Sequence, residues 1–252
     1  MPNSPSVVSN HRIISVCMAT YNANHFFQEQ MDSILSQQLN EGDKLEVVLS
    51  DDSTNDNTLR MVEAYHDERI VYFRHTNRKQ FRYYKNLRCA TQNFENAIRF
   101  SRGEIIFLSD QDDIWYPGRI KAMVDVLDGT NKHFVSSSFH WMYNGKVFSK
   151  TIMRPLSLIK ILSHSGIFGF SCAFTREFAD YILPFHKVHQ YDTYLGALAV
   201  RNQVAVFDER IMAAHRCYPE QTSNSGFHEP LWIKVLFRCR LIFSVIFKRK
   251  LI

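Results

Sequence analysis

An open, mostly parallel α/β sheet with helices on both faces is the fold class that this sequence predicts. Apolar, strand-like runs alternate with segments of helical periodicity through roughly the first 130 residues. Each apolar run is followed by a polar loop, as happens where a buried strand ends at the edge of a sheet. A chain of 252 residues with 45% hydrophobic residues can also bury the large core that such a fold needs.

The predicted strands are near-continuous apolar runs, which is the pattern of strands buried on both faces. They span residues 12–19, 44–50, 69–75 and 104–109. Apolar residues at helical spacing mark the segments between and after them, namely 25–38, 55–66, 85–101 and 117–129. Pro117 can begin the last of these helices, and Gly129 can end it.

The alternation changes beyond residue 130. Asn144 and Gly145 lie between two strand-like runs, which is typical of a tight β-hairpin turn. A helix-rich stretch follows, with one helix predicted over 191–201, and then two short strands at 203–208 and 210–215. We expect three parts in the chain: a flexible N-terminus over 1–11, one folded domain over 12–225, and a basic amphipathic helix over 229–252.

Charge and cysteine content narrow the class of protein. The net charge is +5, and Lys and Arg gather at 74–88 and 248–250, which suits a solvated face, a phosphate-bearing ligand or an anionic membrane surface. The five cysteines form no CxxC pair, as expected of reduced thiols in a cytoplasmic protein. No signal peptide is visible, and the longest apolar run, 241–247, is too short to cross a bilayer.

Three polar clusters follow strands whose carboxyl ends should share one edge of the sheet. They are Thr20-Tyr21-Asn22, Asp51-Asp52-Ser53 and the acidic loop Asp110-Gln111-Asp112-Asp113. Ligands of open α/β sheets bind at that edge. A single acidic pair more often forms a turn or caps a helix, but three clusters at one edge favour a binding site.

The motifs that are absent help to define this site. The sequence has no GxGxxG, GxxxxGK[ST], GxSxG or HExxH pattern, so the usual phosphate-binding loops and the usual hydrolase and zinc-protease motifs are missing. Carboxylate oxygens are ligands for hard divalent cations. The acidic edge therefore indicates magnesium or manganese, through which an anionic, phosphate-bearing substrate can bind.

Four blocks of the sequence resemble, in order and spacing, the family 2 glycosyltransferases of GT-A fold. They are ISVCMATYN (14–22), VVLSDDSTNDNT (47–58), SRGEIIFLSDQDDIWYPGRI (101–120) and HQYDTYLGALA (189–199). The third block is most similar to bacterial rhamnosyltransferase-like members that build cell-surface polysaccharide. The resemblance covers roughly residues 12–225 and implies a nucleotide-diphosphate sugar as donor and an acceptor hydroxyl.

The resemblance implies roles for residues that bind the donor. Thr20, Tyr21 and Asn22 fall in the loop that meets the nucleotide, where the Tyr21 ring can stack on the base. Asp52 matches a carboxylate that accepts a hydrogen bond from the base, whereas Asp51 is expected to be structural. Asn93, on the donor-side helix, matches a sugar or phosphate contact.

The resemblance also implies a metal site and a catalytic base. Asp110 and Asp112 form the DxD pair, in which Asp112 is expected to bind Mn²⁺ or Mg²⁺ and Asp110 to lie nearer the ribose or a metal-bound water. Asp113 fits the role of capping the helix after Trp115 at least as well as it fits a role in this site. Asp192 matches the base that takes the acceptor's proton in a direct, inverting displacement; the alternative is a first-turn carboxylate that stabilises its own helix.

The chain departs from the family pattern after this base. Members often carry Arg-x-His in the following strand; here Arg216 is kept, as a donor-binding candidate, but Tyr218 stands in the position of the histidine. His215 lies three positions away, and on a strand that shift predicts a side chain facing another direction. Whether Tyr218 or His215 takes the third place at the metal is left open.

The C-terminal segment carries an apolar stripe at helical spacing. The stripe consists of Trp232, Val235, Leu236, Cys239, Ile242, Phe243 and Ile246. Lys234, Arg238, Arg240 and the closing KRK provide a basic side. Such a helix can lie in a membrane interface that contains anionic lipids. It can equally pack on the domain core or on a second subunit.

We therefore expect a metal-dependent, inverting glycosyltransferase that acts on a glycan or lipid-linked acceptor in the synthesis of O-antigen, capsule or lipopolysaccharide. Its expected place is the cytoplasm, with peripheral contact to the inner face of the cytoplasmic membrane. One rival is a sugar-phosphate nucleotidyltransferase, but the Gly-rich basic loop of such enzymes is absent from residues 20–27. Another is a non-catalytic binding protein that uses residues 74–88; because the acidic edge repels polyanions, we expect no nucleic-acid partner.

Overall fold

The computed structural model describes residues 11–76, 81–185, 188–218 and 229–251, so most of the predicted N-terminal tail lies outside the described residues. The strands are β1 (Ile13–Thr20), β2 (Lys44–Asp51), β3 (Ile70–Arg74), β4 (Ile105–Ser109), β5 (Ile114–Trp115), β6 (Phe134–Tyr143), β7 (Lys146–Thr151), β8 (Cys172–Thr175) and β9 (Ala205–Cys217). The helices are α1 (Phe26–Leu35), α2 (Asn57–Glu63), α3 (Lys85–Phe100), α4 (Arg119–Asp128), α5 (Leu158–His164), α6 (Arg176–Ile182), α7 (Tyr191–Arg201) and α8 (Leu231–Ile246), with a short 3₁₀ turn at Gly169–Ser171.

One mixed sheet organises the described part of the chain. Its strand order is β3-β2-β1-β4-β8-β6-β9-β5, and β7 pairs with β6 outside this path. The strands β3, β2, β1 and β4 are parallel, whereas β8 joins β4 in antiparallel orientation. Ile14, Val16 and Met18 of the central strand β1 are fully buried, which explains the continuous apolar run. The predicted α/β class is confirmed.

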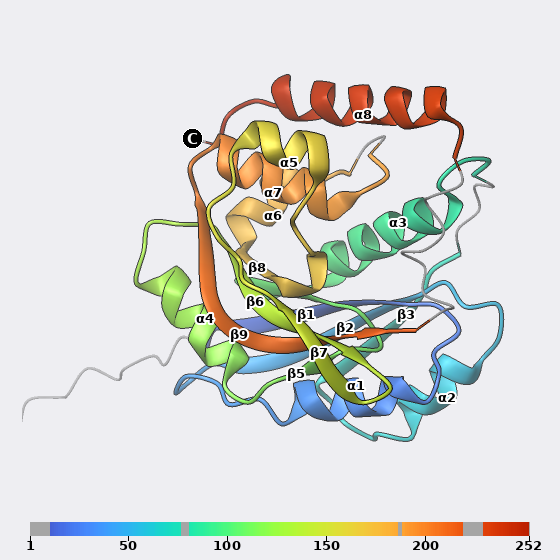
Figure 1. Cartoon of the computed structure of the whole chain (residues 1–252). Coiled ribbons are helices and arrows are strands. Elements are labelled where there is room, and N and C mark those ends of the chain that lie inside the picture. Colours follow the sequence, from blue (N-terminus) through green and yellow to red (C-terminus); the bar gives the residue numbers. More distant parts are fainter. Residues whose placement is uncertain (1–10, 77–80, 186–187, 219–228, 252) are drawn as a thin grey trace, which may run out of the picture.

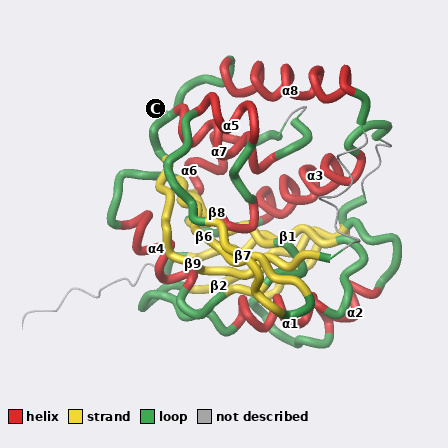
Figure 2. Tube along the Cα trace, viewed as in Figure 1, coloured by secondary structure: helices red, strands yellow, loops and turns green. Residues whose placement is uncertain are grey.

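The helices cover both faces of the sheet (Figures 1 and 2). In the view of Figure 1, α1 and α2 lie below the strands, and α3, α6 and α7 lie above them. Phe94, Ala97 and Ile98 form the buried face of α3, which packs on β1 and β2. This layered arrangement leaves the carboxyl ends of the parallel strands free to form a site.

The C-terminal half of the sheet agrees with the sequence at the hairpin and differs from it at the last strand. Asn144 and Gly145 have φ values of +47° and +73° and connect β6 to β7, as the turn signal predicted. The two short strands predicted at 203–208 and 210–215 are one strand, β9, which pairs with β6 on both sides of a register shift. The polar residues 208–210 lie at this register shift. In the sequence they look like a turn between two strands, although the pairing of β9 with β6 continues beyond them.

The final helix α8 packs on the domain. Its buried face consists of Ile233, Phe237, Leu241 and Val245, which recur every fourth residue, and the helix contacts α5 and α7. The apolar stripe predicted from the sequence, which runs from Trp232 to Ile246, is therefore not the face that packs on the domain. Among the described residues, no helix combines the length and the apolar character needed to cross a membrane.

Candidate active site

The polar clusters predicted to meet do so at the ends of β1, β2 and β4. β1 lies between β2 and β4, and Thr20, its last residue, is paired in register with Asp51 at the end of β2. The acidic loop 110–113 leaves β4 at the same edge and leads at once into β5. The parallel strand order therefore brings segments some ninety residues apart into one site.

Asp51 anchors the first loop from inside the protein. Its carboxylate is fully buried and accepts hydrogen bonds from the Thr20 hydroxyl at 3.0 Å and the Tyr72 hydroxyl at 2.6 Å. The Thr20 side chain thus points inward, to Asp51, and shapes the loop through the protein's own contacts. Asp51 has the structural surroundings that were expected of it.

Tyr21 is the exposed member of the first loop. Its ring is 53% exposed, while its backbone is tied to the acidic loop: the amide donates to Gln111 Oε1 at 2.9 Å, and Gln111 Nε2 donates to its carbonyl at 3.2 Å. The next residue, Asn22, is tied to the loop after β2, because its backbone amide donates a hydrogen bond to Ser53 Oγ at 2.6 Å. Gln111 was not singled out from the sequence; its place inside the acidic loop was the available signal.

Asn93 supports Asp52 from helix α3. Its amide nitrogen donates to the Thr20 carbonyl at 3.0 Å and to Asp52 Oδ1 at 3.2 Å, and its oxygen accepts from the Ser50 hydroxyl. The side chain is only 1% exposed. With both ends of its amide engaged by protein, Asn93 is placed to position Asp52, and its predicted contact with sugar or phosphate stays a prediction.

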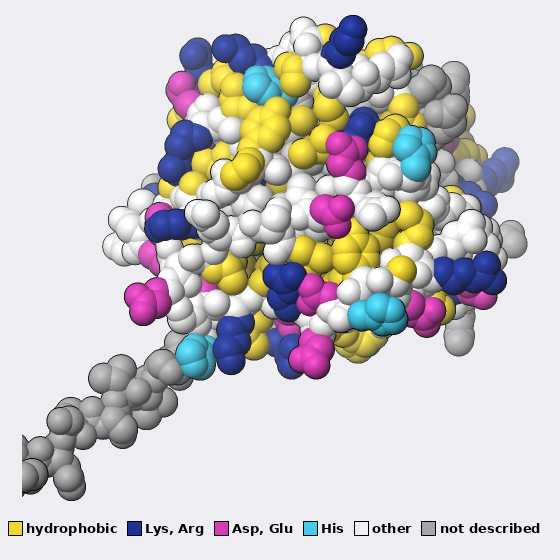
Figure 3. Space-filling view, turned by 90° about the horizontal axis from the view of Figure 1, so that it is seen from below, with side chains coloured by type: hydrophobic (Ala, Val, Ile, Leu, Met, Phe, Trp, Pro, Cys, Tyr) yellow, Lys and Arg dark blue, Asp and Glu magenta, His cyan; other side chains and the backbone are white. Residues whose placement is uncertain are grey.

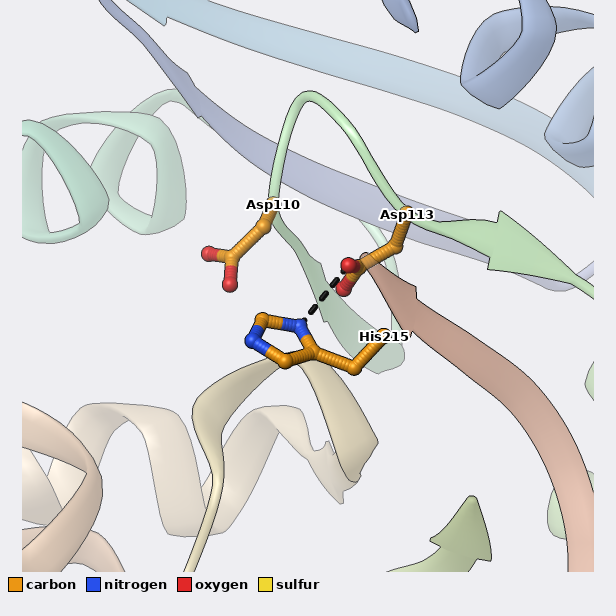
Figure 4. A group of neighbouring side chains, drawn as sticks. All are labelled: Asp110, Asp113 and His215. Atoms are coloured by element: carbon orange, nitrogen blue, oxygen red, sulfur yellow. Dashed lines mark hydrogen bonds and ion pairs between the residues drawn. The ribbon is translucent and has the colours of Figure 1, made fainter. Parts of the chain in front are cut away.

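The acidic loop meets strand β9 through Asp113 (Figure 4). β5 pairs with β9 so that Ile114 lies opposite Ala214, which puts His215 beside Asp113. Asp113 Oδ1 lies 2.8 Å from His215 Nδ1 and accepts the Arg216 amide at 3.1 Å. The expectation that Asp113 caps the next helix is wrong, because α4 begins after Gly118 without a side-chain cap.

Asp110, Asp113 and His215 form a group that could hold a metal ion. One ligand atom from each lies within 4.8 Å of the others, and Figure 4 shows the three side chains converging. Asp113 Oδ2 is buried and has no hydrogen-bond partner among the described residues. A buried carboxylate oxygen without a donor, next to a second carboxylate and an imidazole, fits a divalent cation such as Mn²⁺ or Mg²⁺.

Tyr218 and Arg216 hold the other side of the acidic loop. The Tyr218 hydroxyl donates to Asp112 Oδ2, and Arg216 Nε donates to the Asp112 carbonyl at 2.9 Å. The Arg216 guanidinium also pairs with Glu29 and lies over the Phe26 ring, 4.0 Å from its centroid. Arg216, expected to bind the donor, is thus 5% exposed and braces the loop.

Tyr218 and His215 both reach the acidic loop, so the expectation that His215 faces elsewhere is wrong. β9 ends at Cys217, and Tyr218 therefore escapes the strand alternation on which that expectation depended. His215 is fixed by aromatic side chains: its ring stacks on Phe170 with centroids 4.4 Å apart, and Trp141 lies edge-on at 5.2 Å. His215 therefore lies beside Asp113, and Tyr218 donates a hydrogen bond to Asp112.

Burial and mutual repulsion perturb the charges of the cluster. Burial and then the Asp113 charge raise the pKa of Asp112 to about 6, and burial together with both neighbouring carboxylates raises the pKa of Asp110 well above its usual range. For His215, burial opposes ionisation, but the charges of Asp113, Asp110 and Asp112 prevail and raise its pKa to about 9. Asp110 and Asp112 therefore bind protons more readily than exposed carboxylates do, and a metal ion would compete with these protons.

Asp192 lies in the first turn of α7, as predicted, in the electrostatic range of this cluster. Its carboxylate accepts the Thr193 amide at 2.6 Å, and its charge contributes to the raised pKa of Asp110. Burial raises the pKa of Asp192 itself to about 6, although the Thr193 hydrogen bonds oppose the shift. A carboxylate with this pKa can accept a proton near neutral pH.

Comparisons with known proteins agree with this architecture. The sequence profile described as Glycosyl transferase family 2 matches residues 15–182. The chain is 24% identical over 219 residues to the Escherichia coli UDP-Glc:alpha-D-GlcNAc-diphosphoundecaprenol beta-1,3-glucosyltransferase WfgD, covering 86% of this chain and 82% of that protein. It is 32% identical over 127 residues to the Shigella flexneri dTDP-rhamnosyl transferase RfbG, covering 48% of this chain and 40% of that protein.

Solved structures show the same fold at low sequence identity. The S. aureus TarS 1–349 structure in complex with UDP-GlcNAc superposes with a TM-score of 0.64 at 15% identity, over 93% of this chain and 67% of that one. The mannosyltransferase PcManGT from Pyrobaculum calidifontis, solved with GDP-Man and Mn²⁺, gives 0.57 at 20% identity, over 83% and 58%. The chain therefore belongs to glycosyl transferase family 2 and is a nucleotide-sugar glycosyltransferase of GT-A fold.

Proposed function

We propose that this chain is a metal-dependent, inverting glycosyltransferase that moves a sugar from a nucleotide diphosphate to a hydroxyl of a glycan or lipid-linked acceptor. The observation that carries the proposal is the convergence of Asp110, Asp113 and His215 at the sheet edge, with Asp192 nearby. A buried, unpartnered carboxylate oxygen in this group supports a cation there.

The metal would be held by Asp110, Asp113 and His215, and Asp112 is a further candidate on the same loop. When bound, a divalent cation neutralises negative charge on the departing diphosphate. Arg216 and Gln111 keep the loop in place, the first through the Asp112 carbonyl and the second through the backbone of Tyr21. This pre-organisation lets the carboxylates face the ligand without rearrangement.

The nucleoside would lie over the first loop. The half-exposed Tyr21 ring offers a flat surface for the base, and Asp52, supported by Asn93, offers a carboxylate to a base or ribose donor. Thr20, Asn22 and Asp51 hold the loop that presents these two groups.

Asp192 would act as the general base. It takes the proton of the acceptor hydroxyl while that oxygen attacks the anomeric carbon from the face opposite the diphosphate. The new carbon–oxygen bond forms as the bond to the diphosphate breaks, and the leaving group keeps the electron pair. The anomeric configuration is inverted, and the proton remains on Asp192.

A lipid-linked acceptor and a role in cell-surface polysaccharide synthesis are supported by the relatives. WfgD is named for transfer to a diphosphoundecaprenol-linked sugar, and RfbG for transfer of rhamnose from a dTDP donor. With an acceptor of this class, we infer that the reaction takes place at the inner face of the cytoplasmic membrane.

The test is a screen of nucleotide sugars with MnCl₂, in which release of the nucleoside diphosphate is measured with and without an undecaprenyl-diphosphate-linked acceptor. We expect release that depends on one donor, on acceptor and on metal, and an inverted linkage by NMR. EDTA should abolish it. If no donor is used and pyrophosphate is instead released from a nucleoside triphosphate and a sugar 1-phosphate, the chain is a nucleotidyltransferase.

A further inference from the structure

Helix α8 has two apolar faces on opposite sides. Its buried face, Ile233, Phe237, Leu241 and Val245, is 0–3% exposed. Successive residues of a helix are rotated by about 100°, so the other apolar side chains lie roughly opposite this face. These form the exposed face: Trp232, Val235, Leu236, Phe243 and Ile246, which are 38–61% exposed. A helix that only covered a core would need the first face and not the second.

Further exposed apolar side chains lie at the two ends of α8 and on a neighbouring helix. Leu231 and Phe247, at its two ends, are 77% and 74% exposed, and Ile159 on the neighbouring helix α5 is 81% exposed. The two helices are joined, because the Arg238 guanidinium donates to the Leu162 carbonyl at 2.9 Å. Large apolar side chains exposed together along the whole length of one helix indicate a surface that is covered in use.

The charged side chains that α8 and the residues after it carry have one sign. Residues 230–250 contain Lys234, Arg238, Arg240, Lys248, Arg249 and Lys250 and neither Asp nor Glu. Lys234 and Arg240 lie on opposite margins of the exposed face, between it and the buried face. The opposite side of the molecule, seen from below in Figure 3, carries Lys, Arg, Asp and Glu side by side. An apolar face flanked by cationic side chains is complementary to an anionic surface.

We propose that the exposed face of α8 lies in the surface of an anionic phospholipid bilayer, with the helix parallel to the membrane plane. Apolar side chains would enter the boundary between headgroups and acyl chains, and the cations on both margins would meet lipid phosphates. A second copy of the chain fits less well, because pairing two such faces would bring the cations of both copies together.

The same helix is coupled to the segment that leads to Asp192. Phe237, on the buried face, packs edge-on against His189 with ring centroids 4.9 Å apart, and His189 lies three residues before Asp192. α8 also contacts α7, which carries Asp192. If the proposed function holds, a docked α8 keeps the site next to a lipid-linked acceptor.

The test measures binding of the full-length protein to vesicles of phosphatidylcholine with phosphatidylglycerol, compared with phosphatidylcholine alone, by co-sedimentation. Removing the helix would also expose the surface under its buried face, so point substitutions are preferable. Trp232→Ser with Phe243→Ser should weaken binding by at least about tenfold. Lys234→Gln with Arg240→Gln should weaken it by about fivefold for each cation removed.

The matched control is Val147→Ser with Phe148→Ser in β7, whose side chains are 50% and 63% exposed on another surface. It should bind vesicles like the wild type, and thermal melts should show that every variant is folded. The proposal is overturned if the wild-type protein does not co-sediment with anionic vesicles, or if the Trp232/Phe243 variant binds them with the affinity of the wild type. A wild-type dimer that this variant dissociates assigns the face to a second copy and overturns it too. The vesicles contain neither donor nor acceptor, so failure here is independent of the proposed transferase activity.

Discussion

The two halves of the sheet contribute to the site in different ways. The parallel half, β3-β2-β1-β4, presents a loop after each strand. Direct hydrogen bonds join the polar groups of these loops, such as Thr20 to Asp51 and Asn93 to Asp52. The other half sends one long strand, β9, back to the acidic loop with His215 and Arg216, followed by Tyr218. The parallel half presents the preshaped loops, among them the acidic loop after β4, and the other half supplies the side chains that pair with the buried carboxylates of that loop.

This difference separates two kinds of failure. Changes in the loops after β1 and β2 should distort the surface that presents the donor. Changes in the acidic loop, β9 and α7 should instead alter charge, metal affinity or proton transfer and leave those two loops intact. The predictions below test the second kind of failure, beginning with the largest expected effect.

Asp192→Asn should lower the turnover of sugar transfer by about a hundredfold to ten-thousandfold, the range for loss of a general base. Asn keeps the size of the side chain and can still accept the Thr193 amide. Donor and metal affinity, measured by calorimetry, should stay within about twofold, because Asp192 acts only on the acceptor proton. Glu177→Gln, in the first turn of α6, is the control with unchanged turnover. Full transfer by Asp192→Asn would exclude it as the base.

Asp110→Asn should lower activity by about a hundredfold or more and also make the metal-free protein more stable. The raised pKa of Asp110 means that folding disfavours its ionised form, so stability is lost as pH rises through that pKa. Asn removes this cost at neutral pH and should raise the melting temperature by about 2–4 °C for each kcal/mol gained.

Scanning fluorimetry with and without MnCl₂ measures both effects of Asp110→Asn. The wild type should gain stability from the metal, and the variant should lose that gain. A variant that melts lower than the wild type without metal, yet is still stabilised by MnCl₂, would contradict the placement of Asp110 in the metal site.

His215→Gln should weaken Mn²⁺ binding by about tenfold to a hundredfold, as expected when a ligand or its close support is lost. Tyr218→Phe tests the other side of the loop, because it removes only the donor to Asp112 Oδ2. If Asp112 binds the metal, as the sequence predicted, freeing its oxygen should strengthen Mn²⁺ binding severalfold. If Asp110, Asp113 and His215 hold the metal without Asp112, Tyr218→Phe should leave the affinity unchanged.

The pH dependence of turnover is the last prediction, because it has the smallest expected effect near neutral pH. With a pKa of about 6, Asp192 is mostly ionised at pH 7 and becomes protonated as pH falls through that value. Turnover at saturating donor and metal should therefore fall by about tenfold for each pH unit below it. The residual activity of Asp192→Asn should lack this limb of the profile, and an unchanged limb in the variant would assign it to another group.

The strand-and-loop pattern made the parallel half predictable. The strands at 12–19, 44–50, 69–75 and 104–109 were found within one or two residues. β1, β2 and β4 are almost entirely buried and end at polar clusters, whereas the edge strand β3 is only partly buried and was found from its apolar run alone. The sequence also placed Asp192 in the first turn of its helix. It did not find Gln111, whose role depends on reaching the Tyr21 backbone across the gap between two loops.

The sequence by itself determined the fold class, the family and the sheet edge at which the polar residues gather, because these depend on local periodicity and on motifs that are contiguous in the chain. Only the tertiary structure decided which groups meet the acidic loop. A two-residue strand, β5, pairs with β9 and carries His215 to Asp113, while Tyr218 turns to Asp112 after that strand ends. It also decided which face of α8 is buried. The first outcome depends on strand register between segments about a hundred residues apart, and the second on the helices against which α8 packs. Local spacing encodes neither.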